Sequence, residues 1–193
     1  MTPIPNRTIY LACDGFGQDL LNAVKTHLEQ NHHVKVEDLG CDTYYDAAAH
    51  VSKAITKTHP KDGTSTSTST NDERGEKLGM LFCGTGMGVG IVANKFAGIR
   101  AAPCENVTAA RCARAVNDSN VLCIGQLVTE PEAAKKIVDE FLSQKFISQP
   151  HGEDGKPLSW WNGGVEQFLS TSMEGVTRVE QEALDQGIPK VSS

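Results

Sequence analysis

Short apolar runs alternate with amphipathic stretches along most of this 193-residue chain. Five runs have the length and apolar content of buried strands, and after each one apolar residues recur at helical spacing. The predicted strands cover residues 8–13, 33–39, 78–83, 99–104 and 120–125, and the predicted helices cover 18–30, 47–57, a stretch ending near 95, 108–116 and 131–145. This alternation predicts an α/β fold, in which helices cover both faces of a parallel sheet.

Two segments depart from this pattern. Lys61–Lys77 contains a Thr-Ser repeat and almost no apolar residue, so burial cannot offset the entropy of ordering it. We therefore expect a flexible insertion within a domain that covers residues 1–146. The remaining segment, 147–193, contains Trp160-Trp161 and a helical stretch at 165–169. It is too short for a core of its own, and we expect a C-terminal extension that packs on the domain or on a partner subunit.

The predicted sheet suggests where a ligand binds. In an open parallel sheet, ligands bind beyond the carboxyl ends of the strands, at the point where the strand order reverses. Five βα units most commonly have the order 2-1-3-4-5, which places this crevice between the first and third strands. Cys13-Asp14-Gly15 follows the first strand, and Cys83-Gly84-Thr85-Gly86-Met87-Gly88 follows the third. These two segments are the candidate site.

The second segment has the chemistry of an anion site beside a reactive group. Its glycines leave main-chain N–H groups open to a bound anion, and the positive end of the following helix points to the same place. A cysteine beside such a helix end is favoured as a thiolate, so Cys83 is a candidate base or nucleophile. A structural glycine turn with Cys83 in the core is the alternative, and Asp14 can equally be a helix cap. A dinucleotide site at 88–93 is disfavoured because that motif normally follows the first strand.

Charge and cysteine content limit the binding partners and the cellular location that we expect. Acidic residues outnumber basic ones by 24 to 18, which argues against nucleic acid and anionic membranes as partners. The chain has no apolar run near the roughly 18–20 residues of a membrane span, and its first residues are not typical of a secretory signal. Six scattered cysteines without a C-x-x-C pair predict free thiols rather than disulfides or a zinc knuckle. We expect a cytoplasmic protein.

Three stretches carry a resemblance to a known family: YLACDGFGQDL (10–20), CGTGMGVGIVANKFAGIRAA (83–102) and VNDSNVLCIG (116–125). Together they resemble the type B ribose-5-phosphate isomerase and galactose-6-phosphate isomerase family over roughly residues 8–146. The resemblance implies a Rossmann-like three-layer fold and a homodimer with active sites near the subunit interface. It also implies aldose–ketose isomerisation of a small sugar phosphate through an enediolate, without a metal or organic cofactor.

The same resemblance assigns roles to individual residues. It implies that Cys83 moves a proton between two neighbouring carbons of the sugar. The other implied site residues hold the enediolate or contact the substrate: Gly84, Thr85, Gly86, Met87, Gly88 and Asn117 for the enediolate, and Asp14 and Tyr44 for the substrate.

The chain also departs from the family pattern. Gly15 and Val116 stand where the family usually has histidines, one of them credited with opening the sugar ring, and Leu127 stands where an arginine is common. These departures suggest the hypothesis that the substrate needs no ring opening, as in a tetrose phosphate. Two other functions remain open: a cysteine hydrolase or transferase with Cys83 as nucleophile, and a non-catalytic sugar or anion sensor.

Overall fold

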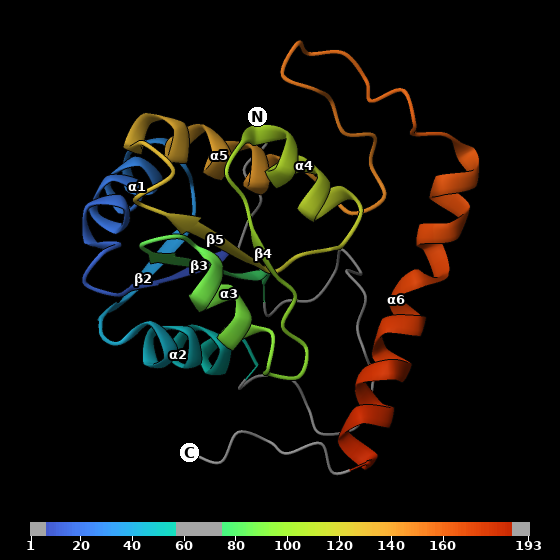
Figure 1. Ribbon diagram of the computed structural model, residues 1–193. Coiled ribbons are helices and arrows are strands. Elements are labelled where there is room, and N and C mark those ends of the chain that lie inside the picture. Colours follow the sequence, from blue (N-terminus) through green and yellow to red (C-terminus); the bar gives the residue numbers. More distant parts are fainter. Residues whose placement is uncertain (1–6, 57–74, 187–193) are drawn as a thin grey trace.

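The computed structural model describes residues 7–56 and 75–186, and within these ranges it has three layers (Figure 1). The central sheet is parallel throughout its described strands, which are β1 (Thr8–Cys13), β2 (Lys35–Cys41), β3 (Lys77–Cys83), β4 (Ala101–Pro103) and β5 (Val121–Gly125). The described helices are α1 (Gln18–Asn31), α2 (Tyr44–Thr56), α3 (Met87–Ala93), α4 (Val107–Ala115), α5 (Pro131–Ser143) and α6 (Gly163–Asp185). The predicted α/β class is confirmed. No helix in these ranges is long and apolar enough to cross a membrane.

The order of the strands is 2-1-3-5-4, so the expected order 2-1-3-4-5 is wrong for the last two. Burial explains the exchange. All five residues of β5 are buried, and β5 pairs with β3 inside the sheet. β4 has three residues, none of them buried, and its Pro103 has no N–H to donate, which suits the edge of a sheet. The reversal between β1 and β3 is unaffected.

Alternate residues of the strands enter two separate cores. Leu11, Phe82 and Ile124 are in the core under α1, α4 and α5, whereas Cys83 and Cys123 are in the core under α2 and α3. Figure 1 shows these two sets of helices on opposite sides of the sheet. Because Cys83 is the last residue of β3, its side chain lies at the carboxyl end of the sheet, on the side covered by α2 and α3.

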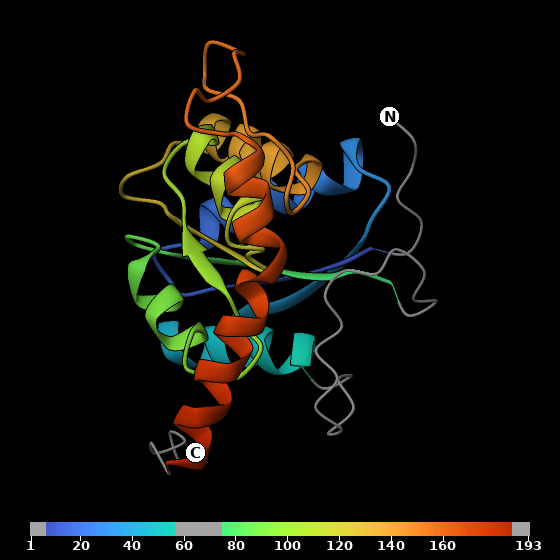
Figure 2. The same cartoon turned by 90° about the vertical axis from the view of Figure 1, so that its right-hand side faces the viewer.

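The C-terminal segment is more helical than its sequence predicts. Helix α6 extends the expected stretch 165–169 to Gly163–Asp185 and crosses the thickness of the domain beside β4 (Figures 1 and 2). Asn162 caps it by accepting hydrogen bonds from the amides of its first turn, and Leu169 packs with Trp161 against Ala115. Beyond Leu169 the apolar residues continue at helical spacing, with Met173, Val176, Val179 and Ala183, so the sequence does contain a signal for the longer helix that the expected stretch leaves out.

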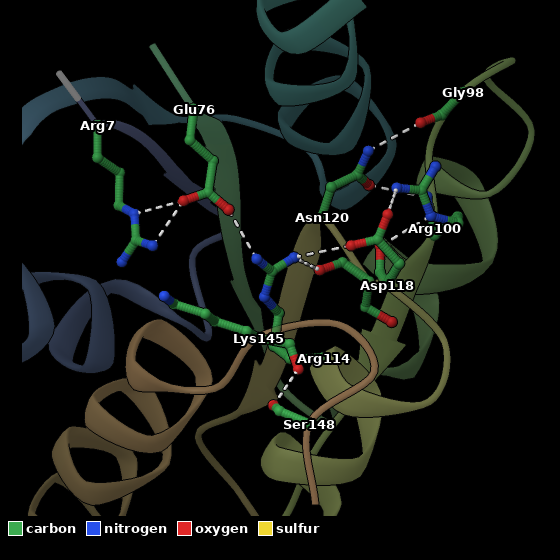
Figure 3. Close-up of polar contacts among 10 residues, drawn as sticks. Arg7, Glu76, Gly98, Arg100, Arg114, Asp118, Asn120, Lys145 and Ser148 are labelled. Carbon is green, nitrogen blue, oxygen red and sulfur yellow. Dashed lines mark hydrogen bonds and ion pairs between the residues drawn. The ribbon is translucent and has the colours of Figure 1, made fainter. Parts of the chain in front are cut away.

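A buried ion-pair network lies at the amino ends of the strands (Figure 3). The carboxylate of Glu76 lies 2.6 Å from Nη2 of Arg7 and 2.6 Å from Nη2 of Arg114, and both arginine side chains are almost fully buried. Glu76 belongs to the expected flexible insertion 61–77. Most of that insertion lies outside the described residues, but its last residues are ordered by this network and by β3, which begins at Lys77.

The network continues to a buried aspartate between α4 and β5. Asp118 accepts a hydrogen bond from Nη2 of Arg100 at 2.8 Å and lies 3.5 Å from Nη1 of Arg114. Burial raises the pKa of Asp118, and the two arginines act in the opposite direction. The chain of charges thus joins the start of β1, the start of β3, α4 and the entry to β5.

We expect Glu76→Gln to lower the free energy of unfolding by about 3 kcal/mol, because it leaves two buried guanidinium groups without their shared carboxylate. Urea denaturation followed by circular dichroism measures the effect. Glu174→Gln, on the exposed side of α6, is the matched control, and we expect it to change stability by less than about 0.5 kcal/mol. Equal stability of the two variants would show that the network contributes nothing.

Candidate active site

A cleft of about 270 Å³ opens at the carboxyl ends of β1 and β3, where the sequence predicts the ligand crevice. Its lining residues come from the turns after β1, β3 and β5 and from the first turns of α2 and α3: Asp14, Phe16, Tyr44, Cys83, Gly84, Thr85, Gly88 and Leu127. Six of the eight are predicted site residues. The structure therefore brings most of the predicted set together around one cleft.

The turn after β1 lies directly against the end of β3. The amide of Asp14 donates to the carbonyl of Phe82 at 3.0 Å, and Asp14 Oδ1 accepts from the amides of Phe16 and Gly17 at 2.9 and 3.1 Å. Gly17 makes this approach possible, since a Cβ on it would lie 2.4 Å from the carbonyl carbon of Phe82. Asp14 thus closes its own turn, as a capping residue does, and also borders the cleft.

The glycine turn after β3 wraps around the sulfur of Cys83. The amide of Gly86 donates a hydrogen bond to Cys83 Sγ at 3.1 Å. Gly86 has a φ of 75°, a conformation that side chains disfavour, and this fold of the turn aims its N–H back at the sulfur. The amides of Gln126 and Leu127 donate to the carbonyls of Cys83 and Gly84, each at 2.9 Å, so the turn is fixed to the end of β5.

The surroundings of Cys83 differ from those of four other cysteines, of which Cys13, Cys104 and Cys123 are buried and Cys112 is half-buried. Burial raises the pKa of Cys13 and Cys104 to about 12, and it also raises the pKa of Cys112 and Cys123. These four are suited to packing, as the sequence suggests for most of its cysteines. Cys83 combines a main-chain donor at its sulfur with a place in the cleft wall.

Aromatic and aliphatic side chains form the rim of the cleft. The ring of Tyr44 lies over Gly88, close enough that a Cβ there would be 3.3 Å from Tyr44 Cδ2. Phe16 and Leu127 are 68% and 70% exposed, and Phe16 is a site residue that the sequence did not reveal, because a lone aromatic in a turn has no periodic signal. The lining set contains no lysine, arginine or histidine, so the described cleft has no cation of its own.

Three predicted residues lie outside the lining set. Gly86 acts from behind the sulfur through its N–H, and Met87 is half exposed at the start of α3. Asn117 lies before β5, whose first residue pairs with Gly79, whereas Cys83 lies level with the last residue of β5. Four strand residues, or about 13 Å, separate these levels. Within one chain, the expectation that Asn117 and Cys83 share a site is therefore not met.

Gln126 has a local role that the sequence did not predict. Its Oε1 accepts from the amides of Asp19 and Leu20 at 3.1 and 3.3 Å, and its Nε2 donates to Asp19 Oδ2 at 3.1 Å. A side chain from the end of β5 therefore caps the first turn of α1. These first amides of α1 are engaged within the chain, and a substrate anion has to find its donors elsewhere.

The fold and the cleft together define a Rossmann-like α/β protein whose candidate site has a cysteine between two turns at the strand reversal. The family model described as Ribose/Galactose Isomerase matches residues 9–156. This match covers most of the chain, and the chain belongs to that family.

Individual relatives agree with this assignment. The chain is 36% identical over 154 residues to a probable ribose-5-phosphate isomerase B of Mycoplasma pneumoniae, covering 77% of this chain and 90% of the relative. It is 34% identical over 140 residues to a D-erythrulose-4-phosphate isomerase of Pectobacterium atrosepticum, covering 72% and 84%. A DNA damage-repair/toleration protein of Arabidopsis thaliana is 33% identical over 89% of this chain, which spans about half (49%) of that longer protein.

Solved structures of the family have the same fold. The ribose-5-phosphate isomerase B of Clostridium thermocellum superposes with a TM-score of 0.67 at 26% identity, over 91% of this chain and 98% of that one.

We expect Gly17→Ala to destabilise the protein by about 1–3 kcal/mol, because the added methyl group would overlap the backbone of Phe82 and Cys83. Gly15→Ala in the same turn is the control, since a Cβ at Gly15 meets nothing within 4 Å. Thermal unfolding of both variants measures the difference. If the two variants melt together, the close contact between the turn and β3 does not hold the cleft in shape.

Proposed function

We propose that this protein is an aldose–ketose isomerase of a small sugar phosphate and that Cys83 is its catalytic base. The observation that carries the proposal is the position of Cys83 Sγ in the cleft wall, 3.1 Å from the amide of Gly86. Family membership supports the reaction type, because relatives in this family are named sugar-phosphate isomerases. Free cysteines and the family's metabolic relatives support a cytoplasmic location.

The proposed reaction moves one carbon-bound proton. The thiolate of Cys83 removes the proton from the carbon next to the carbonyl, and the electron pair forms the carbon–carbon double bond of an enediolate. The thiol then returns the proton to the neighbouring carbon while a hydroxyl proton passes between the two oxygens. Reactant and product have the same atoms, and no oxidant or cofactor is consumed. General base catalysis of this kind contributes about 10²–10⁴-fold to a rate.

The glycine turn supplies the electrostatic part of the proposal. Negative charge develops on the carbonyl oxygen as the proton leaves, and preorganised N–H donors stabilise it without reorganising. We assign this role to the main-chain amides of the turn Gly84–Gly88, apart from the amide of Gly86, which donates to Cys83 Sγ, and to the hydroxyl of Thr85, which lines the cleft. We assign contacts with the rest of the substrate to Asp14 and Tyr44, which also line the cleft.

We further propose a homodimer with the two sites near its interface. Among the described residues the cleft has no cation for a phosphate, and its rim exposes the apolar side chains of Phe16 and Leu127. A second copy would cover this rim and supply the missing polar groups. In this arrangement Asn117 of one copy can approach the enediolate bound by the other copy, although within its own chain Asn117 lies near the amino ends of the strands.

We expect Cys83→Ala to reduce exchange of the substrate C2 proton with solvent by at least about 10²-fold, because the proton acceptor is lost. Incubation of pentose and tetrose phosphates in D₂O, followed by NMR, measures the exchange. Cys41→Ala is the matched control, since Cys41 is an exposed cysteine at the end of β2.

Each other outcome has a definite meaning. Undiminished exchange in Cys83→Ala contradicts the role of Cys83. Binding without exchange by the unaltered protein indicates a sensor, and a covalent adduct on Cys83 during turnover indicates a hydrolase or transferase. The hydrolase is disfavoured because such a cysteine works with a histidine held against it, and no histidine of residues 7–56 and 75–186 lines the cleft.

We expect the kcat/KM for a tetrose phosphate to exceed that for ribose 5-phosphate by at least about 10-fold, which is about 1.4 kcal/mol of transition-state binding. Val116 stands where the family usually has the histidine credited with ring opening, and a four-carbon aldose 4-phosphate has no free C4 hydroxyl with which to close a ring. The erythrulose-phosphate isomerase among the relatives supports this choice. Equal values for the two substrates, measured in the same coupled assay, would contradict it.

A further inference from the structure

A second cluster of polar side chains lies between α1 and α5, away from the cleft. His27 is on α1, His32 directly follows α1, and Asp139 is on α5. The Nε2 atoms of His27 and His32 lie 2.6 and 2.7 Å from the same oxygen, Oδ1 of Asp139. Figure 1 shows the two helices side by side on one face of the sheet. Three potential metal ligands therefore converge on one point between two packed helices.

The geometry points to a site for a divalent transition-metal ion, with Zn²⁺ as the representative, bound by His27, His32 and Asp139. Each residue offers one ligand atom, and the three atoms lie within 4.8 Å of one another. Bonds of about 2.0–2.2 Å to a tetrahedral Zn²⁺ place neighbouring ligand atoms about 3.3 Å apart. The two nitrogen–oxygen separations therefore need to open by about 0.6 Å when a metal ion enters.

The side chains are held in place from outside the cluster. The side chains of His27 and His32 are 16% and 14% exposed, and their rings meet edge to face with centroids 5.5 Å apart. The amide nitrogen of Asn31 lies 3.2 Å from Nδ1 of His27 and donates to the backbone carbonyl of His27 at 3.0 Å. A histidine that binds a metal through Nε2 donates its Nδ1–H to an oxygen, so Asn31 has to turn its carboxamide oxygen toward Nδ1 when a metal binds. The amide of His32 donates to the carbonyl of Leu28 at 3.0 Å, which fixes the backbone at the end of α1.

The types of ligand atom favour particular metal ions. Two imidazoles and one carboxylate suit Zn²⁺, Co²⁺, Ni²⁺ or Cu²⁺, whereas Mg²⁺ and Ca²⁺ prefer oxygen ligands alone. The cluster borders a groove of about 630 Å³, from which water can complete the coordination. The groove is also lined by Glu132, Lys135 and Lys136, and Lys135 pairs with Glu132 at 2.6 Å. These charges largely cancel, so affinity has to come from the ligand atoms rather than from a general negative field.

The metal site is independent of the proposed isomerase activity. His27 lies nine residues after Gln18, the first residue of α1, which corresponds to about 14 Å along the helix. The start of α1 is the end that adjoins the cleft, because the turn after β1 leads into it. An ion at the far end would join α1 to α5 and stabilise the folded chain by binding to it alone.

Titration of the full-length, reduced protein with Zn²⁺ tests the site. We expect one equivalent to bind and to raise the melting temperature, and we expect His32→Gln to weaken this binding by at least about 10-fold. The neighbouring exposed residue supplies the matched control, and His33→Gln is expected to bind as the unaltered protein does. Asp139→Asn provides a second ligand variant, and circular dichroism without metal establishes that each variant is folded.

Spectroscopy of the unaltered protein keeps the test decisive if a variant fails to fold. Zn²⁺ is expected to shift the NMR ring signals of His27 and His32 and to leave those of His33 in place. Co²⁺ is expected to bind without a thiolate-to-cobalt charge-transfer band, because no cysteine belongs to the site. Absence of stoichiometric binding, equal affinity of His32→Gln and His33→Gln, or a thiolate band would overturn the proposal and leave a hydrogen-bonded contact between two helices.

Discussion

The candidate active site depends on the close contact between two backbone turns at the ends of β1 and β3. Gly17 lies where any Cβ would overlap the backbone of Phe82, and the left-handed Gly86 turns its amide back to the sulfur of Cys83. The carboxyl ends of neighbouring parallel strands lie side by side, so the turns that follow these strands are adjacent. Glycine is what lets them meet closely enough to surround a thiol with main-chain groups.

The amino and carboxyl ends of the strands have different roles. The amino ends carry the buried ion pairs, and the carboxyl ends carry the candidate active site. Glu76 gathers two buried arginines at the amino ends of β1 and β3, and Asp118 extends this network into the entry of β5. Every charge there has an opposite charge close by, which buried charges require. At the carboxyl ends the cleft is lined mainly by apolar groups and main-chain amides, and Asp14 is the one carboxylate among its described lining residues.

The sequence alone predicted the central residues of the candidate site but not the full set of residues around it. Strand pattern and topology placed Cys83, Gly84 and Asp14 at one crevice, because adjacent strands carry their following turns with them. The exchange of β4 and β5 was not predictable from the sequence. It depends on whether the three residues of β4 or the five residues of β5 pair with β3. Motif spacing does not show that Asn117 lies at the amino ends of the strands in its own chain, and the pairing of His32 with Asp139 spans 107 residues. Contacts of that kind arise only from the packing of helices.

The central claim is that Cys83 faces the reacting carbons while the glycine turn holds their oxygens. A crystal structure with a four-carbon phosphorylated hydroxamate, an analogue of the enediolate, tests it most directly. We expect Cys83 Sγ within about 3.5 Å of the hydroxamate carbon and the analogue's two oxygens within hydrogen-bond distance of the amides of the turn. An analogue bound in the same cleft with its oxygens turned away from these amides, or bound elsewhere, would contradict the account.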